Sequence, residues 1–541
     1  MNGSSAVRNA WVRSLLGRMG PVLVPLVTVL ATVELGPVSR AAFAQSTVSL
    51  DSHLINPTLP SGASMGWRSD SMASDGDRVV LGAYGVQRAF VFERLPSGAW
   101  AMVAELAPPI DAPMFGVGVS IRGDEVAVGA PRASVSGLAE AGRVFAYRRN
   151  PAGEWQLTQT IDPESPTAIG WFGTSLALDG DFLAVGTGGN SPSAQRVCVY
   201  SRSQAGHWSL DATLLSPDAG VSDSASAPQF GFPVRLVGDF LLTADCNRDA
   251  PGATDAGRGY VFRRQDVGVW ALEARLNHPE PSPEDGSVSI GGTGYIATNI
   301  ALGPSMAVLS LGGDDSALGA DQGSAHVFAR APDGTWSLQS SLVAPDGRAG
   351  DWMGWSSVRI VADELLVGSV GWDGADGSAA ERGRVVRFRR DGAVWQSLSA
   401  IEDPLGLPGH RFGSGIAAGG GFICIAASWG DSGRGCGVVF GFGPDCDRNT
   451  IADPLDVVRG ALDSNSNRVP DECECDSLPW SAACCIGNVN GDAVVDGADL
   501  GFLLNAWGAC SPTCAEDLDR DGVVGGNDLG TLLAAWGPCS P

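Results

Sequence analysis

Two stretches near the C-terminus alternate oxygen-bearing side chains with small residues: NVNGDAVVDGAD (488–499) and DLDRDGVVGGND (517–528). In a twelve-residue loop of the EF-hand type, oxygen atoms at positions 1, 3, 5, 7, 9 and 12 surround one Ca²⁺, and position 7 uses its backbone carbonyl. In the first stretch these positions are Asn488, Asn490, Asp492, Val494, Asp496 and Asp499. In the second, the donors are Asp517, Asp519, Asp521, Val523 and Asp528. The sequence therefore predicts two Ca²⁺ sites.

The two loops differ at positions that tune calcium affinity. The second loop begins with Asp517 and has Gly522 at the sharp turn, where the first has Asn488 and Ala493. Position 9 of the second loop is Gly525, where a water molecule can replace the missing side chain. We expect the second loop to bind Ca²⁺ more tightly.

Each loop continues into a short apolar segment, LGFLLNAW or LGTLLAAW, that predicts one helix after the loop and none before it. The whole unit recurs at an offset of 29 residues, from Cys485 to Cys514. This doubled loop and exit helix resembles a dockerin domain, closest to the Gly-Cys-type dockerins of planctomycete secreted proteins. The resemblance assigns 484–541 to a dockerin-like calcium-binding domain.

The resemblance also implies a cohesin-like or other envelope protein as the partner of this domain. Cellulosomal dockerins often contact a cohesin through Ser or Thr at loop positions 10 and 11. Here those positions are Gly497-Ala498 and Gly526-Asn527, a departure from the usual cohesin contact.

Four cysteines frame the two units, and an even, clustered set in an exported chain predicts disulfides. Two pairings respect the internal repeat: Cys485–Cys510 with Cys514–Cys539, or Cys485–Cys539 with Cys510–Cys514. The ends of dockerin domains lie close together, so the resemblance slightly favours the second pairing.

The preceding segment, 444–483, is rich in Asp and Asn and contains two phrases with alternating oxygen side chains. It resembles thrombospondin type 3-like calcium repeats, which predicts further, weaker Ca²⁺ binding; the alternative is a polar linker. The candidate ligands are Asp445, Asp447, Asn449, Asp453, Asp463, Asn465, Asn467 and Asp471.

The region 45–443 contains a repeat of about 55–65 residues. Each copy has most of five marks: Phe-Gly or Met-Gly, a Gly-Asp turn, an apolar run, an x-V-F-x strand and a Trp before a fourth strand. Four short antiparallel strands per copy cannot bury their faces alone, and radial packing solves that. The predicted fold is mostly β, a seven-bladed β-propeller, followed by a small α/loop EF-hand-like module. The copies begin near Met65, Phe115, Phe172, Phe230, Gly294, Met353 and Phe412.

The seventh copy stops after its third strand, CGVVFGFG (436–443). The missing fourth strand is found at the other end of the mature chain: VSLDSHLINP (48–57) is similar to the fourth strand WSLDATLLSP (208–217) of an internal copy. We therefore expect this N-terminal strand to pair with the last blade and to close the ring, which removes an open sheet edge.

The repeats resemble the FG-GAP family, bacterial relatives of the integrin α propeller. The resemblance rests on Phe-Gly, the Gly-Asp turn, VGAP at 128–131 and the x-V-F-x strand. The D-x-D-x-D-G calcium loops of many such propellers are absent from the region 45–443, so no metal is predicted in the propeller.

The ends and the charge of the chain indicate its compartment. The first 44 residues combine Arg8, Arg13 and Arg18 with an apolar run and an Ala42-Phe43-Ala44 cleavage site, which predicts a signal peptide and a secreted or cell-surface protein. The formal net charge is −25, which argues against nucleic acid as a partner. The apolar run is too short to span a bilayer, so no membrane insertion is expected.

No catalytic constellation is recognisable: H-E-x-x-H does not occur, and GDSG (430–433) is interpreted as a turn. The five histidines lie far apart in the sequence, although folding could bring some together. We therefore predict a non-catalytic binding or scaffold protein whose propeller presents a ligand-binding face to an unknown protein or glycan. The alternative is a polysaccharide hydrolase or lyase delivered by the dockerin-like tail, with a carboxylate pair at the propeller axis.

Overall fold

The computed structural model describes most of the propeller region and short parts of the tail. The described residues are 47–56, 58–189, 195–219, 229–246, 248, 257–279, 298–316, 318–375, 377, 380–429, 433–443, 452, 457, 487–490, 494–509, 516–518 and 523–538. The predicted signal peptide (1–44) lies outside them.

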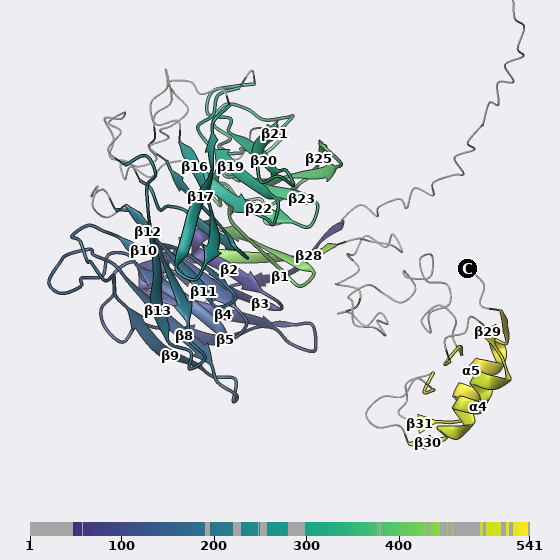
Figure 1. Ribbon diagram of the computed structural model, residues 1–541. Helices are drawn as coiled ribbons and strands as arrows, with labels where there is room; N and C mark the ends of the chain where they lie inside the picture. Colours follow the sequence, from purple (N-terminus) through teal and green to yellow (C-terminus); the bar gives the residue numbers. More distant parts are fainter. Residues whose placement is uncertain are drawn as a thin grey trace, which may run out of the picture. The chain divides into compact units, whose positions relative to one another are not determined.

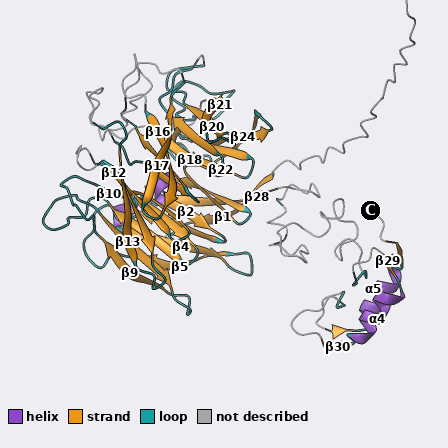
Figure 2. Ribbon diagram, in the orientation of Figure 1, coloured by secondary structure: helices purple, strands orange, loops and turns teal. Residues whose placement is uncertain are grey.

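Within these residues the chain forms seven four-stranded antiparallel sheets, called blades one to seven in chain order (Figures 1 and 2). The strands of blades one to three are β2 (Met72–Asp75), β3 (Arg78–Ala83), β4 (Arg88–Arg94), β5 (Trp100–Leu106); β6 (Gly118–Arg122), β7 (Glu125–Ala130), β8 (Arg143–Arg149), β9 (Trp155–Ile161); β10 (Phe172–Asp179), β11 (Phe182–Thr187), β12 (Arg196–Arg202), β13 (Trp208–Leu215).

The remaining blades repeat the same order of strands. They are β14 (Val234–Val237), β15 (Phe240–Asp245), β16 (Arg258–Asp266), β17 (Val269–Asn277); β18 (Thr298–Leu302), β19 (Met306–Leu311), β20 (Ser324–Arg330), β21 (Trp336–Leu342); β22 (Met353–Val361), β23 (Glu364–Ser369), β24 (Arg384–Asp391), β25 (Val394–Glu402); β26 (Phe412–Gly419), β27 (Phe422–Ala427), β28 (Cys436–Gly443), β1 (Thr47–Leu54).

The first strands of the blades form the inner ring. Each of β2, β6, β10, β14, β18 and β22 contacts the first strand of the next blade, and β26 returns to contact β2. The predicted seven-bladed propeller is therefore confirmed. Two short 3₁₀ helices belong to blade one, η1 (Ser69–Ser71) and η2 (Tyr84–Val86).

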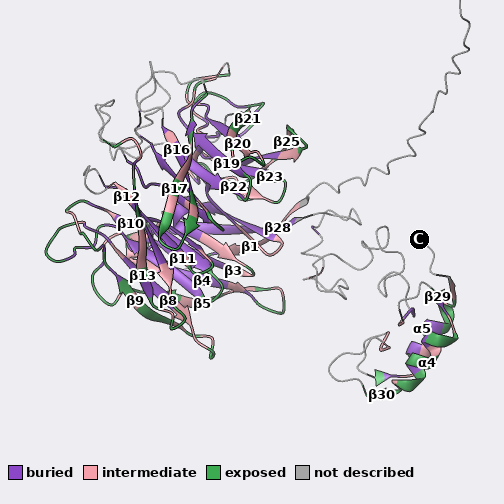
Figure 3. Ribbon diagram, in the orientation of Figure 1, coloured by how far each residue is buried: buried purple, intermediate pink, exposed green. Residues whose placement is uncertain are grey.

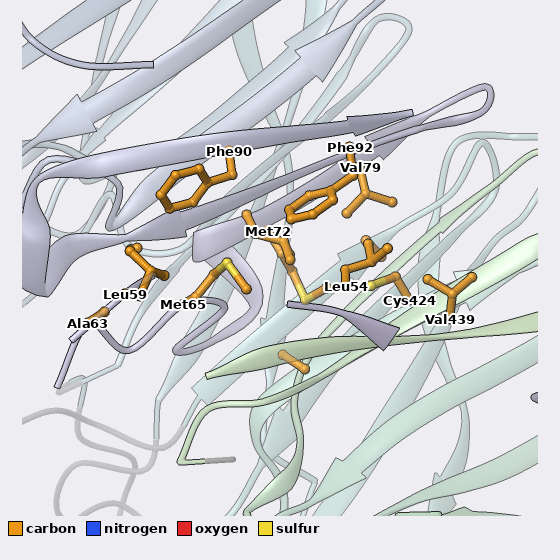
Figure 4. Packing of buried hydrophobic residues seen from close by; sticks show 14 of the residues in the cluster. Leu54, Leu59, Ala63, Met65, Met72, Val79, Phe90, Phe92, Cys424 and Val439 are labelled. Atoms are coloured by element: carbon orange, nitrogen blue, oxygen red, sulfur yellow. The ribbon is translucent and has the colours of Figure 1, made fainter. Parts of the chain in front are cut away.

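The closure by the N-terminal strand is confirmed. β1 pairs antiparallel with β28, with Leu50 opposite Phe440 and Leu54 opposite Gly437. Leu54 is 2% exposed and belongs to the cluster that joins blade seven to blade one, together with Cys424, Val439 and Phe92 (Figure 4). The burial of Leu54 at this seam therefore helps to hold the first strand of the propeller region against its last blade.

The Phe-Gly mark has a direct packing reason. Phe115 is fully buried in the cluster between blades one and two. Gly116 has φ +96°, and a Cβ on it would lie 2.6 Å from the carbonyl oxygen of Arg88 in the neighbouring blade. Apolar clusters of this kind fill the seams between blades (Figure 3, purple). In the repeated dipeptide, the phenylalanine thus supplies an aromatic side chain to the core, and the glycine allows two backbones to approach closely.

The described residues of the tail form two short helices and two pairs of short strands. These are α4 (Gly497–Asn505) and α5 (Gly526–Ala534), with β29 (Val494–Val495) paired to β32 (Gly537–Pro538) and β30 (Gly508–Ala509) paired to β31 (Val523–Val524). Val495, Leu503, Val524 and Leu532 form the core of the described part of the tail. Each predicted loop is therefore followed by one helix. Among the described residues, no helix is long and apolar enough to cross a membrane.

Candidate functional site

The predicted calcium loops are described only in part. In the first loop, the structure describes Asn488, Asn490, Val494, Asp496 and Asp499, whereas Asp492 lies outside the described residues. In the second loop it describes Asp517, Val523 and Asp528, whereas Asp519 and Asp521 lie outside.

The position-12 carboxylates accept hydrogen bonds from backbone N–H groups of their own loops. Asp499 is buried, and its two oxygens accept the backbone N–H groups of Asn490 (3.1 Å) and Asp496 (2.9 Å). Asp528 is buried in the same way and accepts from Leu518 (2.6 Å) and Gly525 (2.7 Å). A carboxylate has about four lone-pair sites, so each keeps sites for a cation. The described donors are all oxygen atoms, the type that Ca²⁺ requires.

The other residues singled out in this region lie outside the described residues. They are Asp445, Asp447, Asn449, Asp453, Asp463, Asn465, Asn467, Asp471, Cys485, Cys510, Cys514 and Cys539.

The propeller contains a cavity that the sequence did not predict. Its volume is about 340 Å³, and the first strands of blades one to six line it. Two of the lining residues, Arg235 on β14 and Arg359 on β22, stand three positions before their hairpin turns. The same position carries small residues in the first three blades, namely Ala73, Ser120 and Ala177.

An insertion in blade one supplies a carboxylate to this cavity. The spacing from Met65 to Gly76 is 11 positions, whereas the corresponding spacing from Phe115 to Gly123 is 8. The extra residues form η1 and place Asp70, which is 4% exposed, in the cavity lining.

Asp70 connects three blades. Its Oδ1 accepts hydrogen bonds from Ser175 Oγ (2.6 Å) and Arg235 Nη1 (3.0 Å). Arg235 also donates to Ser69 Oγ (3.3 Å) and Asn299 Oδ1 (3.2 Å). The charge of Arg235 is therefore balanced within the protein, and its guanidinium is held in one orientation.

The second arginine of the cavity lacks such a partner. Within the described part of the chain, no carboxylate and no hydrogen-bond acceptor pairs with the Arg359 guanidinium, which lines the cavity. Burial and the nearby Arg235 lower the pKa of Arg359 to about 10, so it keeps its positive charge at neutral pH. A desolvated, unpaired guanidinium is costly unless an anion reaches it.

The remaining charges that line the cavity are paired. Arg122 lies 3.1 Å from Asp75 and 3.4 Å from Asp179. Each of the three cavity-lining aspartates is thus held by an arginine, which does not resemble the acid and nucleophile pair of a glycosidase. The lining contains as many arginines as aspartates, and Arg359 is the one arginine among them without a carboxylate partner in the described residues.

The sequence held only a weak signal for this site. Arg235 and Arg359 are two of many arginines, and their convergence depends on the ring. The longer spacing in blade one was visible in the sequence, but its consequence for Asp70 was not.

Comparisons with known proteins do not indicate a function for this chain. No family model and no curated protein matches it. Among solved structures, a protein from Lactobacillus plantarum is 14% identical, with a TM-score of 0.40, over 62% of this chain and 84% of that one. The N-terminal domain of Nup159 is 11% identical, with a TM-score of 0.38, over 74% of this chain and 96% of that one. Likenesses this distant carry no argument about function.

Proposed function

We propose that this protein is an exported binding protein whose axial cavity receives an anionic group of its ligand. The fold is consistent with a binding or scaffold role, and the observation that carries the proposal is the unpaired Arg359 in the cavity. A guanidinium binds a carboxylate or sulfate through two parallel hydrogen bonds. The volume of about 340 Å³ is at the small end of ligand sites, so it suits one acidic sugar unit.

The tail, in this proposal, attaches the protein to a cell-surface or extracellular partner when Ca²⁺ is bound. The support is the donor set of the two loops and the buried carboxylates of Asp499 and Asp528. A cohesin-like or other envelope protein is the expected partner class. The sequence pattern of the signal peptide supports export.

Calorimetric titration of the intact protein with glucuronate and with glucose tests the cavity. We expect glucuronate to bind, glucose to bind at least about tenfold more weakly, and the glucuronate affinity to fall with salt. Arg359→Ala should abolish the preference for the acidic sugar, and Arg359→Lys should retain part of it. Arg263→Ala, a change on the outer part of blade four, is the matched control and should bind as the wild type does. Equal binding of the two sugars, or a preference that survives Arg359→Ala, would refute the role of Arg359.

A further inference from the structure

The ring brings together two of the five histidines at the seam between blades four and five. His278 follows β17 of blade four, whereas His326 lies on β20 of blade five. Asp314 comes from the loop after β19 and completes a group whose ligand atoms all lie within 4.8 Å of one another. Both histidines are buried, and Asp314 is half-buried.

The distances within this group fit metal ligands better than hydrogen bonds. Asp314 Oδ2 lies 3.5 Å from His278 Nε2 and 3.4 Å from His326 Nε2. A good N–H···O hydrogen bond is shorter, about 2.9–3.0 Å. Two ligand atoms in a tetrahedral shell of radius about 2.0–2.1 Å are separated by about 3.3–3.4 Å. The carboxylate oxygen therefore lies where it would share a cation with both imidazoles.

The surroundings of His326 fix its ring as a metal ligand requires. His326 Nδ1 lies 3.0 Å from Ser341 Oγ on β21. In the tautomer that donates Nδ1–H to this hydroxyl, Nε2 carries the lone pair that a metal ion needs and lies 3.4 Å from Asp314 Oδ2. Hydrogen bonds of this kind orient imidazole ligands in metal sites. Ser324 Oγ, 2.9 Å from His326 Nε2, is the polar group beside the remaining coordination position.

Two other seams use different chemistry at the corresponding places. At the seam of blades three and four, Asp218 binds Arg258 and Arg275. At the seam of blades six and seven, His410 Nδ1 lies 2.6 Å from Asp403 Oδ2, with one histidine only. Two imidazoles and a carboxylate are therefore a local feature of the seam between blades four and five.

From this geometry we propose that His278, Asp314 and His326 bind one divalent transition-metal ion, preferably Zn²⁺, that links blades four and five. Two nitrogen donors favour Zn²⁺ over Ca²⁺ or Mg²⁺, which prefer oxygen. Three protein ligands leave the fourth position to a water molecule or to Ser324. This site is separate from the predicted all-oxygen loops of the tail.

The test uses the intact protein, stripped of metal and kept in excess Ca²⁺ so that oxygen sites are filled. One equivalent of Zn²⁺ should bind and raise the melting temperature, since it binds the folded state. Co²⁺ in its place should give the intense visible absorption of a tetrahedral site. His278→Asn, Asp314→Asn and His326→Gln should each lose this binding, and Ser341→Ala should weaken it about tenfold.

His410→Asn is the matched control, because it removes a buried histidine beside an aspartate at another seam. This variant should bind Zn²⁺ as the wild type does, and the tail cysteines are common to all variants. A wild type that neither binds Zn²⁺ under Ca²⁺ nor shows the tetrahedral Co²⁺ spectrum would refute the site. Unchanged binding in folded His278→Asn and Asp314→Asn would refute it as well. If a variant fails to fold, the wild-type Co²⁺ spectrum still decides: tetrahedral visible absorption without the near-ultraviolet charge-transfer bands of thiolate ligands supports the histidine site, and its absence refutes it.

Discussion

At the scale of single residues, the charged side chains of this ring differ in whether they have a partner of opposite charge. Asp218 has such partners, because it accepts hydrogen bonds from Arg275 (2.9 Å), Arg258 (2.9 Å) and Tyr260 (3.0 Å). Burial opposes its charge, but these three hydrogen bonds outweigh burial and lower the pKa of Asp218 to about 2. Arg359, in contrast, faces a cavity without such a partner among the described residues.

Asp218→Asn should destabilise the protein at neutral pH and have little effect in acid. A lowered carboxyl pKa stabilises the fold above the unfolded-state value of about 3.9, and that contribution disappears as the pH falls toward 2. We expect a loss of about 2 kcal/mol in the free energy of unfolding at pH 7.

Urea unfolding at pH 7 and at successively lower pH measures this difference. Asp266→Asn, at an exposed position on β16 of blade four, should be neutral throughout. A gap between Asp218→Asn and the wild type that stays constant down to pH 2 would show that the pairing is not electrostatic.

At the scale of elements, β1 joins the beginning and the end of the propeller region by packing as well as by hydrogen bonds. Asp51 on β1 accepts from Arg94 Nη2 (3.1 Å) and Trp100 Nε1 (3.0 Å) of blade one. On the same strand, Leu54 is 2% exposed and Leu50 is 44% exposed. The register shift between Leu50 and Ser52 places these two leucines on opposite faces, one in the core of the seam and the other open to solvent.

Leu54→Ala should therefore cost about 3 kcal/mol of unfolding free energy, and Leu50→Ala less than about 0.5 kcal/mol. Both changes remove the same atoms from one strand, so propensity effects cancel. Thermal or urea unfolding of the two variants gives the comparison. Equal losses would mean that β1 contributes only its backbone pairing to closure.

The repeat pattern predicted the strands of the blades because the same packing contacts recur in each copy. Phe115 is buried and Gly116 approaches a neighbouring backbone, and Phe230-Gly231 and Phe412-Gly413 do the same at other seams, so both residue types recur along the chain. The similarity of 48–57 to a fourth strand was sufficient to predict β1. The length of η1 and the position of Asp70 were not predictable. The longer spacing in blade one shows that residues are inserted, but not which way the inserted side chains point.

At the scale of the whole molecule, the ring creates sites from residues that are distant in the chain. The cavity combines Asp70, Arg235 and Arg359, and the proposed metal site combines His278 with His326. No local sequence motif predicts the cavity residues or the proposed metal ligands. The tail has the opposite character, since each predicted calcium loop is one continuous stretch, and its function was therefore easier to propose from sequence.

The tail should depend on Ca²⁺ for its stability, whereas the propeller should not. The described core of the tail is small: Val495, Leu503, Val524 and Leu532 form its buried apolar residues. A unit with so little buried surface is marginal without further stabilisation. Ca²⁺ at a hundredfold excess over Kd adds about 2.7 kcal/mol for each site that forms only in the folded state. EGTA, which removes Ca²⁺ selectively, should therefore make 484–541 sensitive to protease and leave 45–443 resistant.

Loop variants give this prediction its sharper form. Replacing Asp517 and Asp521 by Ala should expose the tail to protease even in Ca²⁺, because the second loop has an aspartate at position 1 and Gly522 at the sharp turn and is expected to bind Ca²⁺ more tightly. Replacing Asn488 and Asp492 in the first loop is the matched control and should have the smaller effect. Limited proteolysis with mass spectrometry locates the cuts in each variant. Cleavage of the propeller before the tail in EGTA would place the calcium dependence in the ring. A tail whose resistance is the same with and without Ca²⁺ would show that its small core is sufficient by itself.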